Sequence, residues 1–352
     1  MKGKKPTRET NSTLLKQAML RRLPRRLAAR GDLMIASVPG LLDHYQQMML
    51  SIFSALGRVF NDAEKAHLRT VLETWLKKGW DESPYTRLVV HFETDAPPKT
   101  TISYKVALNV VTIADEYGHW VKTRTPPLFG AHPDSKVMDL ARSLGNPADV
   151  RVLDVGAGTG RNTIPLAREG FQADAVELAP ALAQVLRDDV EKAGLKIRVF
   201  EGDVIDPSLD VPKEYYDMIF LAEVVASHFR DIDHLRKLFT ALVGMLRPGG
   251  TLLFSAFSPG DGYKPDQLAR ELGEVFWCVI FTRSDFEQAF KDLPFEKLSD
   301  ESTLEYERER LPKEHWPPTG WFEQWSSGGD LFDLPMGRAP VELRWLAYRK
   351  KA

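Results

Sequence analysis

A glycine-rich turn in the middle of the chain holds the residues whose types and spacing first suggest chemistry. Residues 151–167 read RVLDVGAGTGRNTIPLA, in which Gly156, Gly158 and Gly160 directly follow an apolar run. Glycine costs backbone entropy, so three glycines in five residues indicate a sharp strand-to-helix turn that a ligand approaches closely. Because backbone N–H groups at a helix N-terminus bind anions, we expect this ligand to carry a phosphate or a carboxylate.

Two carboxylates follow the next two apolar runs. Glu177 is expected to end the second strand, in the run ADAVEL, where it can accept hydrogen bonds from both hydroxyls of a ribose. Asp203 lies in EGDV, where it can accept one from an exocyclic amine such as that of adenine. An acid also follows the dinucleotide-binding fingerprint G-x-G-x-x-G. Here, however, Gly160 comes one residue too early for that fingerprint, and an LRPGG turn at 246–250 precedes the last run. Both features argue against an NAD-dependent oxidoreductase.

Further candidates lie after the fourth apolar run, in AEVVASHFRD at 222–231. His228 has an ordinary pKa of about 6.5, which suits a proton acceptor, and a histidine bonded to backbone is an equal alternative. Glu223 could contact a cofactor or a substrate. The single cysteine, Cys278, follows Trp277 and is interpreted as a small buried hydrophobe. We expect no metal, because no set of His, Asp and Glu has metal-ligand spacing.

The elements that must position these residues follow from the apolar periodicity. Short apolar runs lie at 150–155, 173–178, 197–202, 216–222 and 251–257, and helical patterns lie at 162–169, 180–193 and 232–246. Strand, helix and strand at this spacing predict right-handed crossovers and a parallel sheet with helices on both faces. Two more strands are expected at 295–311 and 341–350, around an insertion at 312–340 that holds three of the eight tryptophans.

The chain before this region has a different pattern. Residues 12–80 are predicted to be helical, with a capping box that begins at Asn61 and a helix end at Gly79. Strand-like runs at 87–94 and 102–111 predict a β-hairpin.

An extended linker, RTPPLFG at 124–130, is predicted to divide the chain, because its paired prolines cannot continue a helix. We therefore expect residues 1–130 to form an N-terminal module of helices and a hairpin that acts as a substrate cap. Residues 131–352 are expected to form the ligand-binding domain, with an aromatic insertion near 312–340.

The composition is that of an ordinary globular protein. The chain has 352 residues, of which 43% are hydrophobic and 27% charged, and its net charge of −2 does not attract nucleic acid globally. Residues 1–30 hold ten Lys or Arg and one acid, which indicates a solvated extension and leaves open an organelle transit segment or a tether to an anionic surface. No apolar stretch approaches the roughly 20 residues of a membrane span, so a cytoplasmic location is expected. The sequence leaves the oligomeric state open.

Taken together, these stretches resemble the class I S-adenosylmethionine-dependent methyltransferase superfamily. The matched stretches between about 148 and 257 are VLDVGAGTG, AVELAP, EGD, YDMIFLAEVVASH and LRPGGTLLFSAF. The resemblance implies a three-layer α/β fold with a doubly wound, mostly parallel seven-stranded sheet, and S-adenosyl-L-methionine as cofactor. In this family the glycine loop binds the methionine part, the acid after the second strand binds the ribose and the acid after the third meets the adenine. The residues thereby assigned to the cofactor are Asp154, Gly156, Ala157, Gly158, Gly160, Glu177, Leu178, Asp203, Val204 and Ala222.

The resemblance also implies methyl transfer to an O, N or S atom of a small-molecule acceptor, on a core similar to the tellurite-resistance type. The carboxylate of the cofactor would then meet the loop amides, with Asp154 near its ammonium group. His228 and Glu223 are the candidates for catalysis, and the aromatic candidates for enclosing the acceptor are Tyr117, Trp120, Tyr263, Trp277 and Trp321. Two alternatives stay open: a methyltransferase that acts on protein or RNA through the basic N-terminal arm, and a protein that binds the cofactor without catalysis.

Overall fold

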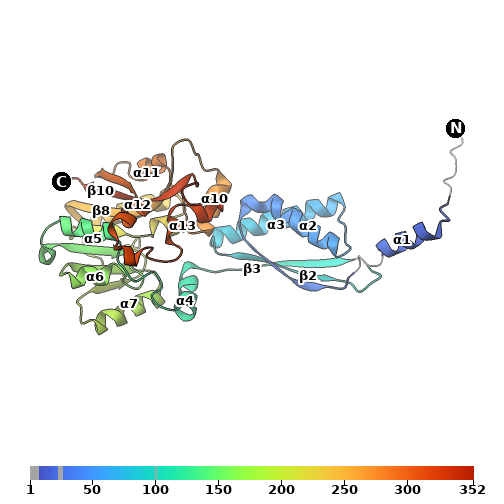
Figure 1. The fold of residues 1–352 in the computed structure, drawn as a ribbon, viewed down its shortest axis with the longest axis horizontal. Helices are drawn as coiled ribbons and strands as arrows, with labels where there is room; N and C mark the ends of the chain where they lie inside the picture. The colour runs from blue at the N-terminus through green and yellow to red at the C-terminus, as the bar shows by residue number, and fades with distance from the viewer. Residues whose placement is uncertain (1–7, 23–26, 100) are drawn as a thin grey trace. The chain divides into compact units, whose positions relative to one another are not determined.

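A computed structural model of the chain describes residues 8–22, 27–99 and 101–352. Parts of the basic segment 1–30 lie outside the described residues, so the tether or transit segment predicted there stays a prediction. The structure divides into two compact units, Met1–Val111 and Thr112–Ala352, and each is described by itself (Figure 1).

In the first unit, the helices α2 and α3 pack on one face of a three-stranded antiparallel sheet of order β1-β2-β3 (Figure 1). The elements are α1 (Ser12–Arg22), β1 (Arg30–Ala36), the 3-10 helix η1 (Pro39–Leu41), α2 (Leu42–Ala55), α3 (Asp62–Glu82), β2 (Arg87–Thr94) and β3 (Ile102–Asn109). Strands β2 and β3 form the predicted hairpin. The core between helices and sheet includes Met49, Phe53, Leu68, Leu72, Leu76 and Leu88.

Two predictions for this unit are wrong in part. Residues 12–80 are not all helical, because β1 pairs with β2 and extends the hairpin to three strands. Helix α3 does not end at Gly79, where a Cβ atom would lie 2.8 Å from Cβ of Ser37, so this glycine permits a close approach inside the helix. The capping box is confirmed, since Asn61 Oδ1 accepts from the N–H of Glu64 at 2.9 Å and the Glu64 carboxylate accepts from the N–H of Asn61 at 2.8 Å.

The second unit is a three-layer α/β domain on a seven-stranded sheet of order β6-β5-β4-β7-β8-β10-β9. The strands are β4 (Arg151–Val155), β5 (Gln172–Glu177), β6 (Arg198–Glu201), β7 (Tyr216–Leu221), β8 (Leu246–Pro259), β9 (Phe295–Ser302) and β10 (Val341–Lys350). Strand β10 runs antiparallel to both of its neighbours, and the pairs from β6 to β8 are parallel. The predicted fold class is confirmed.

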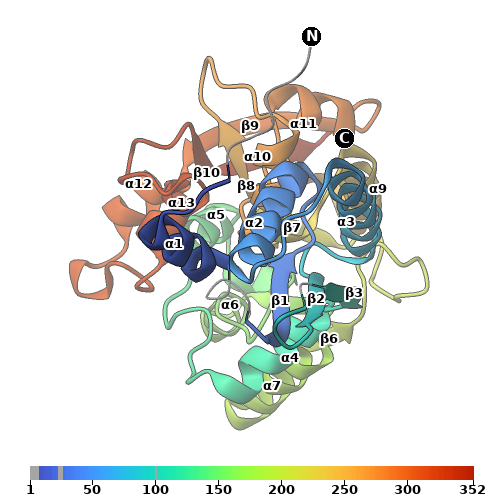
Figure 2. The same ribbon diagram turned by 90° about the vertical axis from the view of Figure 1, so that its right-hand side faces the viewer.

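Helices cover both faces of this sheet. They are α4 (Ile113–Thr123), α5 (Ser135–Ser143), η2 (Pro147–Asp149), α6 (Thr163–Arg168), α7 (Pro180–Lys192), α8 (Val225–His228), α9 (Ile232–Met245), α10 (Gln267–Val275), α11 (Arg283–Ala289), α12 (Thr303–Arg310), η3 (Lys313–His315), α13 (Phe322–Ser326) and α14 (Gly329–Phe332). Alternate residues of β7 enter two cores, Ile219 and Leu221 with α9 and α11, and Met218 and Phe220 with α5 and α6. Figure 2 shows α9 and α5 on opposite sides of β7 and β8. Burial on both faces explains why the runs in the sequence are apolar without alternation.

Three segments of this unit differ from the sequence predictions. Residues 295–311 form β9 and then helix α12, which begins where Ser302 Oγ accepts from the N–H of Glu305 at 3.4 Å. The predicted LRPGG turn belongs to β8, as an irregularity at which Gly249 has φ 78°. The segment ADEYGHWVKTR forms α4, and because the compact units meet at Val111 and Thr112, this helix lies in the second unit.

Candidate functional site

The glycine loop connects β4 to α6 at the carboxyl edge of the sheet. Gly156, Gly158 and Gly160 have φ values of 74°, 56° and 89°, in the left-handed region that other residues rarely adopt. A Cβ atom at Gly156 would collide with the Val224 side chain, and one at Gly158 would lie 3.1 Å from the Phe129 ring. The loop therefore needs glycine for its backbone shape and for its close neighbours.

The side chain of Glu177 binds the loop itself. Its buried carboxylate accepts from the N–H of Gly158 at 2.7 Å and from the N–H of Ala179 at 2.8 Å, and burial raises its pKa. Each carboxylate oxygen can accept a second hydrogen bond. Glu177 can therefore hold the loop and still accept from a ribose, as the resemblance implies.

Four N–H groups of the loop have partners within the protein. The N–H of Gly158 meets Glu177, those of Gly156 and Ala157 donate to the Val176 carbonyl at 2.8 and 3.1 Å, and that of Gly160 donates to the Ala157 carbonyl at 2.9 Å. These four N–H groups already donate to acceptors within the protein, which differs from the expected contact between the loop amides and a ligand carboxylate. Strand β5 supplies the acceptors for three of them, and a turn within the loop supplies the acceptor for the fourth.

The ends of β5 and β6 bring an acid and an apolar side chain beside Glu177. The N–H of Gly202 donates to the Glu177 carbonyl at 3.0 Å, which joins the two strand ends. Asp203 is exposed and accepts from the N–H of Ile205 at 2.9 Å, and Leu178 is 49% exposed. Two carboxylates around an exposed apolar side chain fit a nucleoside, which offers hydroxyls, a flat ring and an amine.

Asp154 lies under the loop at the end of β4. Its carboxylate accepts from Thr163 Oγ1 at 2.6 Å, and burial raises its pKa to about 7. A cation near Asp154 would lower that pKa and bind favourably, in accord with the predicted ammonium contact. Val204 is buried just after β6, and Ala222 is half-buried just after β7.

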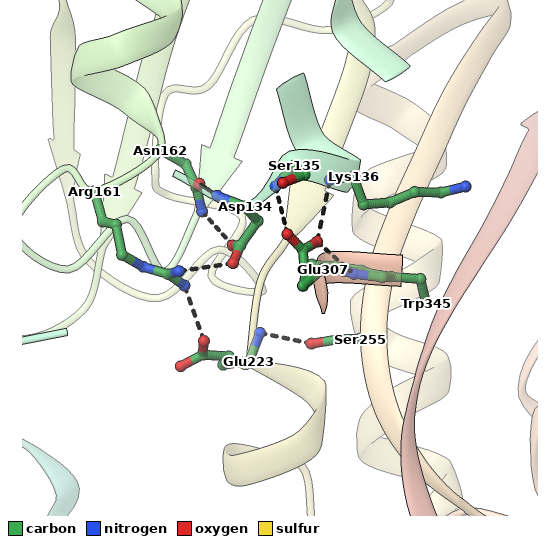
Figure 3. Close-up of polar contacts among 9 residues, drawn as sticks. All are labelled: Asp134, Ser135, Lys136, Arg161, Asn162, Glu223, Ser255, Glu307 and Trp345. Carbon is green, nitrogen blue, oxygen red and sulfur yellow. Dashed lines mark hydrogen bonds and ion pairs between the residues drawn. The ribbon is translucent and has the colours of Figure 1, made fainter. Parts of the chain in front are cut away.

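A buried arginine that the sequence analysis did not identify joins the loop to two other segments. Arg161 follows the last glycine, and its guanidinium donates to Asp134 at 2.6 Å and to Glu223 at 2.9 Å (Figure 3). Its side chain is only 9% exposed. The Asn162 side chain makes two hydrogen bonds of 2.8 Å with Asp134: its Nδ2 donates to the Asp134 carboxylate, and its Oδ1 accepts from the backbone N–H of Asp134. The only feature of the sequence that could have identified Arg161 as a site residue is its position directly after the glycine motif.

Glu223, a predicted catalytic residue, is engaged in this ion pair. Its φ is 65°, and its N–H donates to Ser255 Oγ at 2.7 Å (Figure 3). Burial raises its pKa, and the charge of Arg161 opposes that rise. A strained residue at the end of β7 is a feature that clusters at functional sites. The contacts indicate that Glu223 positions Arg161.

A second buried carboxylate connects α12 to the start of α5. Glu307 accepts from the N–H groups of Ser135 and Lys136 at 2.7 and 3.1 Å, and from Trp345 Nε1 at 3.2 Å (Figure 3). Burial raises its pKa to about 7. A carboxylate at a helix N-terminus satisfies N–H groups that have no partner within the helix. This contact fixes the first turn of α5 next to Asp134.

Five half-buried rings form what we call the aromatic cluster: Tyr117, Trp120, Phe129, His228 and Trp277. The centroid of the Tyr117 ring lies 5.2 Å from that of Trp120, 6.0 Å from Phe129, 5.8 Å from His228 and 5.7 Å from Trp277. The structure thus brings three of the five predicted acceptor-binding residues together with the predicted base. It adds Phe129, which lay in the predicted linker.

The His228 ring is held on two sides. Its Nε2 lies 2.9 Å from Tyr117 Oη. Burial lowers the pKa of His228 to about 4, and a hydrogen bond to the backbone of Ser227 opposes this with a smaller effect. The imidazole is therefore neutral at pH 7. Two alternatives were left open for His228, a proton acceptor or a histidine bonded to backbone. The structure agrees with both, because the ring is bonded to backbone and also faces a candidate substrate residue.

Trp277 has an unusual backbone, with φ 60°. Its carbonyl oxygen accepts from Trp325 Nε1 at 3.1 Å and from Ser227 Oγ at 3.5 Å. A bulky residue adopts a left-handed conformation only where its surroundings hold it there. These contacts therefore set the place of the Trp277 ring in the cluster.

The other two predicted acceptor-binding aromatics lie in a separate group. Tyr263 packs edge-on against Phe332 with centroids 5.8 Å apart, and Trp321 packs on Trp325 at 5.5 Å and is 39% exposed. Cys278 is buried, as interpreted, and burial raises the pKa of its thiol.

Within residues 8–22, 27–99 and 101–352, no group of three or more His, Cys, Asp or Glu is arranged to hold a metal ion, and no helix is long and apolar enough to cross a membrane.

Known proteins match this site and its sheet. Residues 152–250 match a family model described as a methyltransferase domain. An S-adenosyl-L-methionine-dependent Diels–Alderase from Neonectria sp. (strain DH2) is 27% identical, over 61% of this chain and 85% of that protein. The demethylmenaquinone methyltransferase of Tropheryma whipplei (strain Twist) is 29% identical, over 33% of this chain and 46% of its own length. The ubiquinone biosynthesis O-methyltransferase of Xanthomonas euvesicatoria pv. vesicatoria (strain 85-10) is 32% identical, over 32% and 44%. The chain thus spans about half the length of these two curated relatives.

A solved structure assigned to a sarcosine dimethylglycine methyltransferase from Galdieria sulphuraria superposes with a TM-score of 0.50 at 17% identity, over 68% of this chain and 99% of that one. At this identity the likeness concerns the fold alone. It agrees with the strand order, the glycine loop and the matched family model. The match of residues 152–250 to a methyltransferase domain, the relatives and the fold together support a place for the chain among the enzymes of the class I S-adenosylmethionine-dependent methyltransferase superfamily.

Proposed function

We propose that the protein transfers the methyl group of S-adenosylmethionine to an O, N or S atom of a small-molecule acceptor held by the aromatic cluster. The observation that carries this proposal is the place of the cluster beside the glycine loop. The Phe129 ring lies 3.1 Å from the position of a Cβ atom at Gly158, and Val224, which contacts Gly156, directly precedes the helix that ends at His228.

In this proposal, residues at the carboxyl edge of the sheet bind different parts of the cofactor. Glu177 accepts from the ribose, Asp203 with Val204 meets the adenine, and Asp154 faces the ammonium group. S-adenosylmethionine supplies an activated methyl group on a positively charged sulfur. The protein contributes position, since effective molarities for well-aligned pairs reach about 10⁵ M or more.

The rings of the cluster exclude water and orient the acceptor. Half-buried tryptophan and tyrosine faces suit a flat or apolar molecule, and the names of the quinone-pathway relatives support an acceptor of modest size. The strained φ of 60° at Trp277 supports a functional role for its ring.

Calorimetric titration with S-adenosylhomocysteine, with NAD as the parallel control, tests the cofactor. We expect micromolar binding of the first and none of the second. Mass spectrometry of an acceptor panel then tests methyl transfer, which Trp277→Leu should lower at least ~10-fold without changing the affinity for S-adenosylhomocysteine. Binding of NAD alone would overturn the proposal.

A second candidate is a pericyclic reaction that uses the bound cofactor without consuming it. The specific observation in its favour is that the relative named a Diels–Alderase is matched over 85% of its own length. The two candidates differ in mass balance. Methyl transfer adds one methyl group to the product and releases S-adenosylhomocysteine, whereas a cyclisation leaves both the product mass and the cofactor unchanged.

A further inference from the structure

We propose that a cavity between α11 and the strands β9 and β10 binds a free α-amino acid with a large apolar side chain. The cavity has a volume of about 450 Å³, and small-molecule sites occupy roughly 300–1,000 Å³. The described residues that line it include none assigned to the cofactor and no ring of the aromatic cluster. The site is therefore separate from the one proposed for methyl transfer, and its ligand binds whether or not that proposal holds.

Regular elements form two walls of this cavity. Strand β10 contributes alternate residues, among them Leu346 and Tyr348, which lie on one face of the strand. Helix α11 contributes side chains three and four positions apart, the spacing that places residues on one side of a helix. These are Arg283, Phe286, Glu287 and Phe290, the last at the C-cap. The packing of a helix on a sheet thus holds these two walls in place.

Apolar side chains cover the part of the cavity around Tyr348. The Phe290 ring stacks on the Tyr348 ring with centroids 4.1 Å apart and meets the Phe295 ring edge-on at 5.4 Å. Leu346 is buried on the same face of β10. A ligand gains affinity by burying an apolar side chain against such rings, and an aromatic side chain brings the largest area.

The Tyr348 hydroxyl is a polar group that lines this cavity without a partner. The residue is 7% exposed, and within the described ranges its hydroxyl forms no hydrogen bond. The oxygen is not among the atoms that are fully enclosed without a partner, so it is open to the cavity. Burial raises the pKa of Tyr348, and the charges of Asp300 and Glu287 raise it further, so the hydroxyl stays protonated at neutral pH. A ligand group that pairs with it removes the cost of an unsatisfied hydroxyl.

Arg283 and Glu287 bring opposite charges to the same wall. They lie four positions apart on α11, where an arginine and a glutamate can pair. Here they form no ion pair with each other, and across residues 8–22, 27–99 and 101–352 neither side chain has another hydrogen-bond or ion-pair partner. An α-amino acid carries a carboxylate and an ammonium group on one carbon atom. The guanidinium can bind the first and the Glu287 carboxylate the second, each through a charge-assisted hydrogen bond.

The remaining charges of the cavity leave this complement unchanged. Arg344 forms ion pairs with Asp300 and Glu342, and Lys297 Nζ lies 2.7 Å from Asp300 Oδ2. Asp261, an exposed acid after β8, offers a second partner for an ammonium group. A ligand with only a carboxylate would leave these acids unpaired, and one with only an ammonium group would leave the guanidinium on α11 unpaired. A zwitterion satisfies both.

Calorimetric titration of the full chain with L-phenylalanine, L-tryptophan, L-tyrosine and L-leucine tests the site. At least one should bind with a Kd of about 1 mM or lower. The controls each lack one group of the tightest binder. For L-phenylalanine they are 2-phenylethylamine without the carboxylate, 3-phenylpropanoate without the ammonium group and glycine without the ring, and each should bind ~10-fold or more weakly. No binding of any of the four amino acids, or equal affinity for a control compound, would overturn the proposal.

Variants test whether the amino acid occupies this cavity. Arg283→Gln and Glu287→Gln each remove one charge from an exposed position, so the fold should persist in circular dichroism while the affinity falls ~10-fold or more. The control Arg349→Gln changes an exposed arginine on the opposite face of β10 and should bind as the wild type does. Unchanged affinity in either α11 variant would overturn the zwitterion site.

Competition with S-adenosylhomocysteine separates this inference from the proposed function, because that compound also contains an amino-acid group. We expect the amino acid to bind with unchanged affinity in saturating S-adenosylhomocysteine. Displacement would place it in the cofactor site and overturn the inference. Failure of S-adenosylhomocysteine to bind would overturn the proposed function, whereas binding of the amino acid to the same protein, lost in the α11 variants, would still support the cavity.

Discussion

At the scale of single residues, Arg161 stands between two buried carboxylates, Asp134 and Glu223. Removing one partner of a buried ion pair leaves an unpaired charge, which costs about 3–5 kcal/mol. We expect Arg161→Met to lower the free energy of unfolding in urea by about this amount, and added Asp134→Asn and Glu223→Gln to recover most of it. The control Arg142→Met, whose ion pair with Glu169 is exposed, should cost about 1 kcal/mol or less. Equal losses in the two arginine variants would contradict the assignment.

Glu177 has two roles that different substitutions separate. Glu177→Ala removes the bonds to the N–H groups of Gly158 and Ala179, so it should reduce stability by about 1–3 kcal/mol and weaken S-adenosylhomocysteine roughly 100-fold in calorimetry. Glu177→Gln retains an acceptor for the loop and should lose affinity with less loss of stability. The matched control is Glu201→Ala, since Glu201 pairs with Glu177 across the strands and is exposed. Unchanged affinity in both Glu177 variants would remove the ribose assignment.

His228 should make stability depend on pH. Because folding lowers its pKa from 6.5 to about 4, the folded state disfavours the protonated ring, so the stability is fully present above pH 6.5 and is lost as the pH falls toward 4. Between pH 7 and pH 5 the wild type should lose about 2 kcal/mol more than His228→Gln in urea denaturation. The exposed His119 provides the control, as His119→Gln should follow the wild type. Parallel curves for wild type and His228→Gln would contradict this burial.

At the scale of elements, two helical glycines separate helix propensity from packing. Alanine is favoured over glycine in a helix by about 1 kcal/mol. Gly244 in α9 has no atom within 4 Å of a built Cβ, so Gly244→Ala should stabilise the protein by up to about 1 kcal/mol in thermal unfolding. Gly79 in α3 faces the side chain of Ser37 closely, so Gly79→Ala should destabilise by about 1–3 kcal/mol. The same sign for both variants would contradict the packing of α3.

At the scale of the whole molecule, every residue proposed for the cofactor lies in the unit Thr112–Ala352. This unit has its own cores on both faces of its sheet. We therefore expect a protein of residues 112–352 to fold and to bind S-adenosylhomocysteine within about threefold of the affinity of the full chain, as measured by calorimetry. The same protein with Glu177→Ala is the negative control. Loss of cofactor binding in a folded 112–352 protein would show that residues 1–111 contribute to the cofactor site.

The predicted role of residues 1–130 as a substrate cap is tested by the same pair of proteins. A cap acts on the acceptor, so its removal should raise KM for the acceptor and leave the affinity for the cofactor unchanged. Identical KM values in the full chain and in residues 112–352 would remove this role from residues 1–111.

Local features of the sequence determined the chain order of the elements in the second unit and the cofactor edge. The apolar runs from 150 to 257 became β4 to β8, because strands buried on both faces are apolar without alternation. The sequence also indicated the glycine motif and the acids Glu177 and Asp203, because each lies within a few residues of a strand end. Where two local patterns compete, as in 295–311, the sequence indicated a strand and the structure contains a strand followed by a capped helix.

Tertiary structure alone decided which side chains meet. Tyr117 and Trp277 contact His228 although they lie far from it in the chain, and Phe129 packs on Tyr117. Arg161 meets Asp134 and Glu223 in the same way. The protonation state of His228 was also undetermined by the sequence, because burial lowers its pKa and burial depends on the whole fold. Periodicity is a property of neighbours along the chain, so it determines strands, helices and turns. Contacts and desolvation depend on how those elements pack, so they are decided only when the chain has folded.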